Sequence, residues 1–358
     1  MSTLDFVGPN SGAAAVRGMS PAAVAARTAG TTAGEASGDP LVRIAGLTVA
    51  FDDGKRHVPV LHGIDLEVRP GETIGIVGES GCGKSVTWLA VLRLLGKRAR
   101  IGGTVSLGGA PITDFSDRAM ARIRGKRIAM IFQDPASSLN PVHRIGQQLT
   151  EALGLHRGLT GQAAKAEAIR LLDRVHIPNP GQRLNAYPHE LSGGMNQRVM
   201  IAMALAGEPD LLIADEPTTA LDATIQAQIL DLLREIRRDS GMAMALISHD
   251  LGVIADICER VMVMYAGRVV ESAPTKQLFA NPGHPYTRGL LAALPDLDAP
   301  QRRLEAIPGT VPEPGKLPGG CSFRPRCVHA EESCGAEVPG LGFIEKTHQV
   351  ACLKVDSL

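Results

Sequence analysis

The stretch Gly78-Glu79-Ser80-Gly81-Cys82-Gly83-Lys84-Ser85 fits the spacing G-x-x-x-x-G-K-[ST] of a phosphate-binding loop and is the most informative part of this chain. The apolar run Thr73–Val77 before it predicts a buried strand, and the run Val86–Leu95 after it predicts a buried helix. A strand, a glycine-rich loop and a helix start direct backbone N–H groups and the helix dipole at polyphosphate. In such a loop the lysine reaches the β- and γ-phosphates, and the serine hydroxyl binds Mg²⁺.

The order of the remaining apolar runs predicts an α/β fold. Further strands are expected at Leu47–Phe51, Gly63–Val68, Ile128–Phe132, Leu211–Ala214 and Met242–Ile247, and a helix at Ala223–Arg238. Fully apolar runs of four to six residues are typical of strands that are buried on both faces of a parallel sheet. Because strands alternate with helices, we expect a parallel sheet that binds ligands at the polar ends of its strands.

Composition narrows the class of protein. The 358 residues include 37 basic and 37 acidic side chains, and aromatic residues make up 3%. This balance argues against a nucleic-acid binder with a broad basic surface or base-stacking platforms. No apolar stretch reaches the ~18 residues of a membrane span, so we expect a soluble chain. Residues 1–40 lack a signal-peptide core and are expected to be a disordered extension, which places the cysteines in a reducing compartment.

Acidic and polar residues follow the predicted strands where ligands are expected to bind. Asp215 ends an apolar run and is expected to hold Mg²⁺, directly or through water. Glu216 beside it is expected to orient or deprotonate the attacking water. Gln133 and His249 each follow a strand, and each is either a contact to the phosphate and lytic water or a structural strand terminator.

A second anion-binding helix start is predicted at Ser192-Gly193-Gly194, ahead of the apolar helix Val199–Ala206. The alternative is an ordinary serine N-cap. Because the chain already has one phosphate loop, this second start is best explained as a cap on a nucleotide that a second subunit holds.

Together these motifs resemble an ABC-type ATPase subunit, from Leu41 to about Asp298. The matching segments are Walker A (Gly78–Ser85), the Q-loop (Gln133), the signature (Leu191–Gln197), Walker B (Leu212–Glu216), the D-loop (Ala220-Leu221-Asp222) and the H-loop (His249). The resemblance implies a P-loop NTPase fold of the ABC type, with a parallel-sheet core, a β subdomain and a helical subdomain at about residues 141–207.

The same resemblance implies the residues of the ATP site. ATP is expected to contact Phe51, Gly78, Ser80, Gly81, Cys82, Gly83, Lys84, Ser85, Val86, Gln133, Asp215, Ser192, Gly193, Gly194, Gln197 and Asp222. Glu216, His249 and Gln133 are expected to serve catalysis, and Ser85, Gln133 and Asp215 to hold Mg²⁺. Phe51 resembles the aromatic that stacks on adenine in this family, with a core aromatic as the alternative.

Three further strings are similar to the ATPases of dipeptide and oligopeptide importers: Phe132–Pro141, Ala214–Asp222 and His284–Thr287. They imply a peripheral subunit on the cytoplasmic face of the inner membrane that powers peptide uptake. The implied partners are a second, different ATPase chain, two transmembrane permease subunits and an extracytoplasmic substrate-binding protein, and no nucleic acid. Nickel, opine or other small-solute cargo is an alternative, as is a soluble ABC-type ATPase of DNA repair or translation.

The C-terminal cysteines Cys321, Cys327, Cys334 and Cys352 have the spacing C-x₅-C-x₆-C-x₁₇-C, which differs from the paired spacing of zinc ribbons. Four thiolates bind Zn²⁺ or an iron–sulfur cluster, or they stay free. The resemblance to the peptide-importer branch favours a [4Fe–4S] cluster.

Cys82 is expected to make the enzyme sensitive to thiol reagents. The predicted domains are an extension (1–40), the ATPase (41–290) and a small Cys-rich C-terminal module (291–358).

Overall fold

The computed structural model describes residues 39–134, 138–219, 221–294 and 306–355. Contacts group residues 39–358 into one compact unit. Apart from two residues, the expected N-terminal extension lies outside the described ranges, as do Ala220 of the expected D-loop and residues 135–137 after the expected Q-loop. None of the helices in the described ranges is both long and apolar enough to cross a bilayer.

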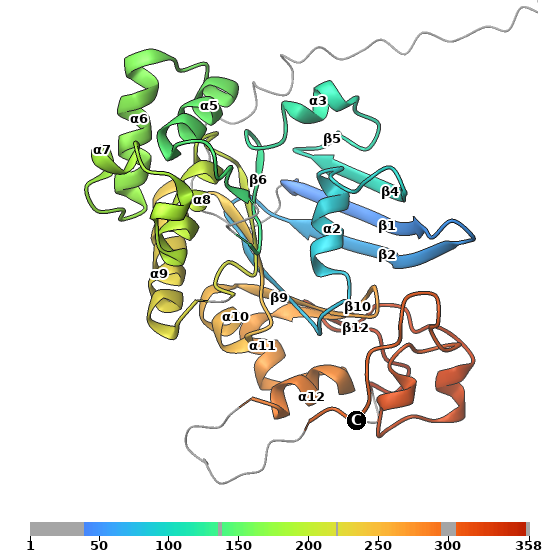
Figure 1. The fold of residues 1–358 in the computed structure, drawn as a ribbon. Coiled ribbons are helices and arrows are strands. Elements are labelled where there is room, and N and C mark those ends of the chain that lie inside the picture. Colours follow the sequence, from blue (N-terminus) through green and yellow to red (C-terminus); the bar gives the residue numbers. More distant parts are fainter. Residues whose placement is uncertain (1–38, 135–137, 220, 295–305, 356–358) are drawn as a thin grey trace, which may run out of the picture. The chain divides into compact units, whose positions relative to one another are not determined.

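A mixed sheet of eight strands forms the centre of the described part (Figure 1). Its order is β11 (Gly342–Glu345), β12 (His348–Val350), β10 (Arg268–Pro274), β9 (Arg260–Tyr265), β3 (Thr73–Val77), β8 (Ala243–Ile247), β7 (Leu211–Asp215) and β6 (Ile128–Ile131). The strands from β9 to β6 run parallel, whereas β10, β12 and β11 continue the sheet antiparallel. The predicted α/β fold is therefore confirmed, with an antiparallel edge that the sequence patterns did not indicate.

Both faces of the central sheet are buried, which explains why its strands are apolar throughout. In β7, Leu211 and Ile213 enter one hydrophobic cluster, and Leu212 and Ala214 enter another. Successive side chains of a strand point to opposite faces, so the two clusters lie on opposite sides of the sheet. Helix α2 (Lys84–Val91) contributes the fully buried Trp88 to the first of these clusters.

A smaller antiparallel sheet has the order β2 (His57–Val68), β1 (Val42–Asp52), β4 (Ala99–Leu107) and β5 (Ala110–Pro111). The strand expected at Leu47–Phe51 begins earlier, because β1 starts at Val42. The pairing of β1 with β2 shifts register between Ile44 and Leu47, where the strand is irregular. This sheet corresponds to the expected β subdomain and carries Phe51.

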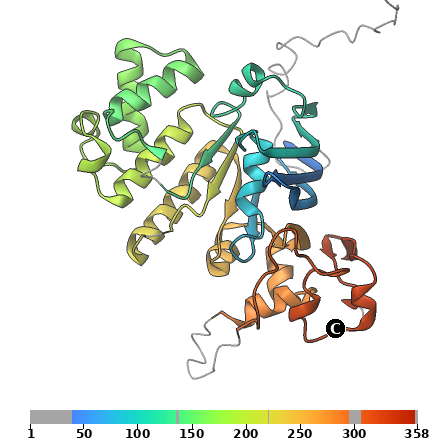
Figure 2. The same ribbon diagram turned by 45° about the vertical axis from the view of Figure 1, so that its right-hand side comes forward.

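The other regular elements of the described chain are helices. They are α3 (Asp117–Ala121), α5 (Ile145–Arg157), α6 (Gly161–Arg174), α7 (Pro180–Arg183), α8 (Gly193–Leu205), α9 (Ala223–Ser240), α10 (Leu251–Ile257), α11 (Thr275–Ala280) and α12 (Pro285–Ala292), with 3₁₀ turns at Pro188–Glu190, Arg324–Arg326 and Glu332–Gly335. Figures 1 and 2 show α5, α6 and α7 gathered on the side of the central sheet away from β1 and β2. Helix α2 ends at Val91 rather than at Leu95, because Arg93 adopts a left-handed φ of 52°.

The C-terminal segment is joined to the central sheet rather than separate from it. Strand β12 pairs with β10, and a wholly buried side-chain pair links the same two strands. His348 Nε2 lies 2.6 Å from Glu271 Oε1, and Glu271 also accepts hydrogen bonds from the backbone N–H groups of Gly283 and His284. The carboxylate thereby has the partners that a buried charge requires.

Candidate functional site

The glycine-rich loop between β3 and α2 has the backbone that a phosphate cradle needs. Gly78, Gly81 and Gly83 have φ values of 149°, 79° and 104°, which side-chain-bearing residues rarely adopt. A Cβ on Gly78 would lie 2.2 Å from the carbonyl oxygen of Met264, so β9 leaves space only for glycine here. The turn delivers the chain directly into the N-terminus of α2 at Lys84.

Lys84, Ser85 and Asp215 meet at the end of this loop. The Lys84 ammonium donates to the carbonyl oxygens of Gly78 at 2.7 Å and Glu79 at 3.2 Å, and the side chain is almost fully buried. Burial raises the pKa of Asp215, while a hydrogen bond with Ser85 and the charge of Lys84 oppose that rise. A buried carboxylate beside a hydroxyl is a donor set that suits Mg²⁺.

Three polar side chains contact the Glu216 carboxylate at the carboxyl edge of the sheet. Its Oε2 accepts from Gln133 Nε2 at 3.1 Å and from Thr219 Oγ1 at 3.0 Å, and lies 3.5 Å from His249 Nδ1. Glu216 itself has a left-handed φ of 47°, a strained backbone that is common at active sites. The three residues predicted to serve catalysis are therefore brought together. Thr219 was not among the predicted site residues, although it lies one turn after Glu216.

Residues of the expected signature lie at the start of α8. Ser192 caps that helix by accepting from the Met195 N–H at 3.3 Å, and a Cβ on Gly194 would lie 2.7 Å from Ile225 Cγ2 of α9. Among the described residues, Ser192 accepts hydrogen bonds only from the first turn of α8, and none comes from the phosphate loop. Gln197 is buried, and its Nε2 has no partner among the described residues. The structure therefore does not bring these residues to the Lys84 loop of the same chain.

The remaining residues expected to contact ATP differ in how far they are exposed to solvent. Ser80 and Gly81 are exposed at the tip of the loop, Val86 is partly buried in α2, and Asp222 is exposed and caps α9 through the Ile225 N–H. Phe51 is half-buried at the end of β1 and packs against the core, a position that fits both a core aromatic and an adenine contact.

Cys82 does not fit its predicted reactivity. Its side chain is fully buried, and burial raises the pKa of its thiol. Thiol reagents attack the thiolate, so a buried thiol of raised pKa is protected. The expectation of a reagent-sensitive Cys82 is therefore wrong, because the side chain turns into the core while the backbone serves the loop.

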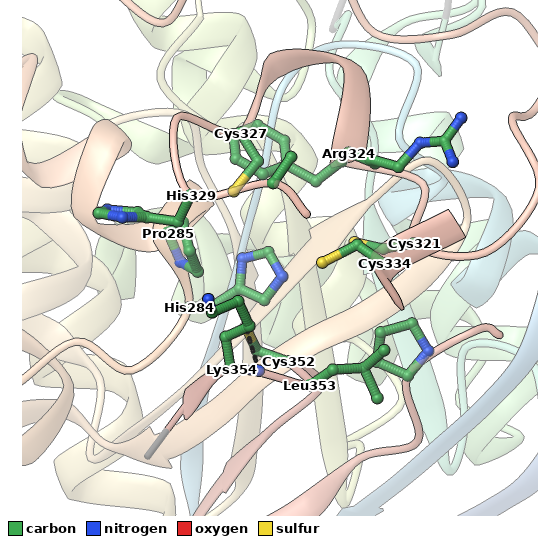
Figure 3. Close-up of a pocket in the computed structure, with 13 residues that line it drawn as sticks. His284, Pro285, Cys321, Arg324, Cys327, His329, Cys334, Cys352, Leu353 and Lys354 are labelled. Atoms are coloured by element: carbon green, nitrogen blue, oxygen red, sulfur yellow. Dashed lines mark hydrogen bonds between the residues drawn. The ribbon is translucent and has the colours of Figure 1, made fainter. Parts of the chain in front are cut away.

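Cys321, Cys327, Cys334 and Cys352 line one pocket with free thiols (Figure 3). Burial is the main cause that raises the pKa of Cys321, Cys327 and Cys352, and electrostatic repulsion couples every pair among the four sulfurs. The thiols therefore converge. Among the described residues, however, no three His, Cys, Asp or Glu side chains form a group that could hold a single metal ion.

Comparisons with known proteins agree with this geometry. The family model for ABC transporters matches residues 61–219, and the model for the C-terminal region of oligopeptide/dipeptide transporters matches residues 270–334. A putative peptide import ATP-binding protein of Brucella melitensis biotype 1 is 49% identical over 331 residues, which cover 89% of this chain and 98% of that protein. A protein of the same description from Brucella abortus strain 2308 is 51% identical over 296 residues, 82% of this chain and 89% of that protein.

This chain belongs to the ATP-binding subunits of the ABC peptide importers. Solved structures of ABC ATPases share its fold. A dimeric ATP-binding cassette in a post-hydrolysis state with ADP and phosphate has a TM-score of 0.59 and 27% identity, covering 65% of this chain and 98% of that chain. The cbiO1 protein of Clostridium perfringens, part of a cbiONQ transporter complex, has a TM-score of 0.58 and 27% identity, covering 68% and 92%. The ABC subunit described here is accordingly an ATPase.

Proposed function

We propose that this chain hydrolyses ATP to power the import of peptides through a membrane ABC transporter. The observation that carries the proposal is the convergence of Gln133, Thr219 and His249 on Glu216, next to the Lys84–Asp215 pair. The match of residues 270–334 to the C-terminal region of oligopeptide/dipeptide transporters supports peptides as the cargo.

We infer a distinct role in ATP hydrolysis for each of these side chains. Lys84 offsets negative charge on the β- and γ-phosphates, and Ser85 and Asp215 would hold Mg²⁺, which supplies further electrostatic stabilisation of the transferring phosphoryl group. Glu216 accepts a proton from the water that attacks the γ-phosphorus, and ADP leaves. Gln133 and Thr219 donate to Glu216 Oε2, so they orient its carboxylate toward that water.

The assembly that we propose follows from the two separated anion sites. The Ser192 helix start lies free of the Lys84 loop in its own chain, so it is available to cap ATP on a partner ATPase. We propose a different chain as that partner, two permease subunits docked on the Q-loop and helical middle, and an extracytoplasmic substrate-binding protein. The chain would then lie on the cytoplasmic face of the inner membrane. Within it, we propose an ATPase domain at 41–290 and a C-terminal module at 291–358.

The substitution Glu216→Gln tests the proposed role of Glu216. It keeps the shape of the side chain but removes the base, so ATP binding should persist while turnover falls by about 100-fold or more. ATP-loaded dimers with the partner ATPase should accumulate. Glu235→Gln, at a partly exposed acid of α9, is the matched control and should leave turnover unchanged. Normal turnover in Glu216→Gln would remove the assigned role.

Peptide uptake in a strain that lacks this subunit, with and without the gene restored, tests whether peptides are the cargo.

We also propose that the four C-terminal cysteines hold a [4Fe–4S] cluster. In such a cluster each thiolate binds a different iron, so the sulfurs surround a common volume and need not meet at one point. All four thiols line one pocket, which is the arrangement that such a cluster would need. A bound cluster would supply structural support or redox chemistry at the C-terminal module.

Anaerobic purification with measurement of iron, sulfide and zinc tests this proposal. About four irons and four sulfides per chain, with a broad visible absorption band, are expected. Substitution of Cys321 by Ser should lower the iron content, whereas Cys258→Ser should not, because Cys258 is a core residue. One zinc per chain, or no metal at all, would contradict the cluster and leave the ATPase assignment intact.

A further inference from the structure

Glu79, the second residue of the phosphate loop, is held by two residues that lie more than 200 positions further along the chain. Its carboxylate Oε2 lies 2.9 Å from Arg326 Nη1, and its backbone N–H donates to Tyr286 Oη at 2.9 Å. On its other side the Glu79 carbonyl accepts from the Lys84 ammonium. One residue therefore connects the C-terminal segment to the lysine that serves the nucleotide phosphates.

The Arg326 side chain is fixed on every side, so it is a rigid support. It is only 5% exposed, and its guanidinium lies over the rings of Tyr265 and Phe323 at 5.8 and 5.9 Å. Its Nε donates to the carbonyl of Pro308 at 2.8 Å, and Nη1 also reaches the Tyr265 hydroxyl. A guanidinium held in this way loses little entropy when it pairs with a carboxylate.

Tyr286 is equally fixed. Its ring is fully buried and packs edge-on against Tyr265 at 4.7 Å and tilted against Phe323 at 5.4 Å. Burial raises the pKa of its hydroxyl, so the group that accepts from the Glu79 N–H stays uncharged. Tyr286 and Arg326 thus present two preorganised polar groups to the same loop residue.

The charge of Glu79 makes the arginine necessary. A carboxylate in a loop that binds polyphosphate repels its ligand, and in a partly buried setting that repulsion is weakly screened. Among the described residues, Arg326 is the one cation that forms an ion pair with the Glu79 carboxylate. Without it, an uncompensated negative charge would remain beside the ATP phosphates.

We propose that Arg326 and Tyr286 are positioning residues for ATP binding, which act on the phosphate loop by clamping Glu79. The C-terminal segment in this way supports the ATP site through Glu79. The proposal rests on ATP binding at the Lys84 loop and is independent of the cargo and of any cluster at the neighbouring Cys327.

A charge-rescue experiment on the purified ATPase with its transporter partners tests the clamp. Arg326→Gln should raise the KM for ATP about tenfold and change kcat by less than about threefold, because it weakens binding of the phosphates rather than the chemical step. The double variant Glu79→Gln with Arg326→Gln should return the KM to within about threefold of the native value, since both charges are gone. Lys316→Gln, which removes the cation of an exposed pair with Glu313 in the same segment, is the matched control and should change neither constant.

Two outcomes would overturn the proposal: an unchanged KM in Arg326→Gln, or a double variant as impaired as Arg326→Gln alone, which would show a purely structural role. Tyr286→Phe provides an independent test of the clamp if Arg326→Gln fails to fold. It deletes only the hydroxyl that receives the Glu79 N–H, and it should raise the KM about threefold at constant kcat. A native KM in Tyr286→Phe would refute the part of the clamp assigned to Tyr286. Absence of ATPase activity in the native protein would instead refute the proposed function.

Discussion

At the scale of single residues, the ATP site separates backbone roles from side-chain roles. Gly78 and Gly83 serve through conformations that other residues avoid, whereas Lys84 and Asp215 serve through buried charges. Cys82 stands between them and contributes only its backbone to the loop. A motif cannot distinguish these roles, because it records which residue is present and not which way the side chain points.

Cys82 and Cys258 should therefore resist alkylation in the native protein. Burial raises the pKa of both thiols, that of Cys258 to about 12, so almost no thiolate exists at about pH 7.5. N-Ethylmaleimide followed by peptide mass spectrometry should find both residues unmodified, with ATPase activity retained. The same treatment in urea should label both and serves as the control. Rapid native labelling of Cys82 would contradict the buried position.

At the scale of elements, an ion-pair network ties the helices of the helical region together. Glu167 of α6 accepts from Arg170 one turn later and, at 2.6 Å, from Arg157 at the end of α5. Arg157 also lies 3.2 Å from Glu208, just beyond α8. The hydrogen bonds from Arg170 are the largest cause that lowers the pKa of Glu167, to about 2.

Glu167→Gln should destabilise the protein in a pH-dependent way. The pKa of Glu167 in the folded state lies below the 4.5 of a free glutamate, so its stabilising contribution is present above about pH 4.5 and is lost as the pH falls toward 2. Urea unfolding should show a loss of about 1 kcal/mol at neutral pH and a shrinking difference from the native protein below pH 4.5. Glu151→Gln, at an exposed acid of α5, is the control. A loss that did not change with pH would argue against the ionised pair.

At the scale of the whole molecule, the C-terminal segment completes the ATPase unit. It extends the central sheet through β12, buries His348 against Glu271, and supplies Arg326 to the phosphate loop. Removal of one partner from a buried hydrogen-bonded pair costs much more than removal from an exposed pair, because the remaining polar group stays buried without that partner. The stability of the described unit should therefore depend on this segment.

The substitution His348→Leu should lower the free energy of unfolding by about 3 kcal/mol, because it leaves Glu271 with backbone partners alone. Denaturant unfolding measures the loss, and limited proteolysis should show earlier cleavage after residue 306. Gln349→Ala changes the neighbouring residue, which is only partly buried, and should cost much less. Equal losses of unfolding free energy in the two variants would mean that the buried pair stabilises the protein no more than its partly buried neighbour does.

The sequence by itself determined the phosphate loop, the buried strands, the acids at their ends and their order along the chain. These features depend on spacing within a few residues: strand β3 was predicted at its observed bounds, and Glu216 was placed directly after β7. The spacing of glycines and apolar residues determines the local backbone conformation and which side chains are buried. These features can therefore be predicted from the sequence alone.

Only the tertiary structure decided which distant residues meet. Gly75 lies in the middle of β3 because a Cβ there would lie 2.6 Å from Ile254 of α10, and Glu79 meets Arg326 across 247 positions. The pairing of β12 with β10 is equally remote in sequence. Such contacts follow from how the sheet and helices pack, and no local pattern encodes the partner of a residue that far away.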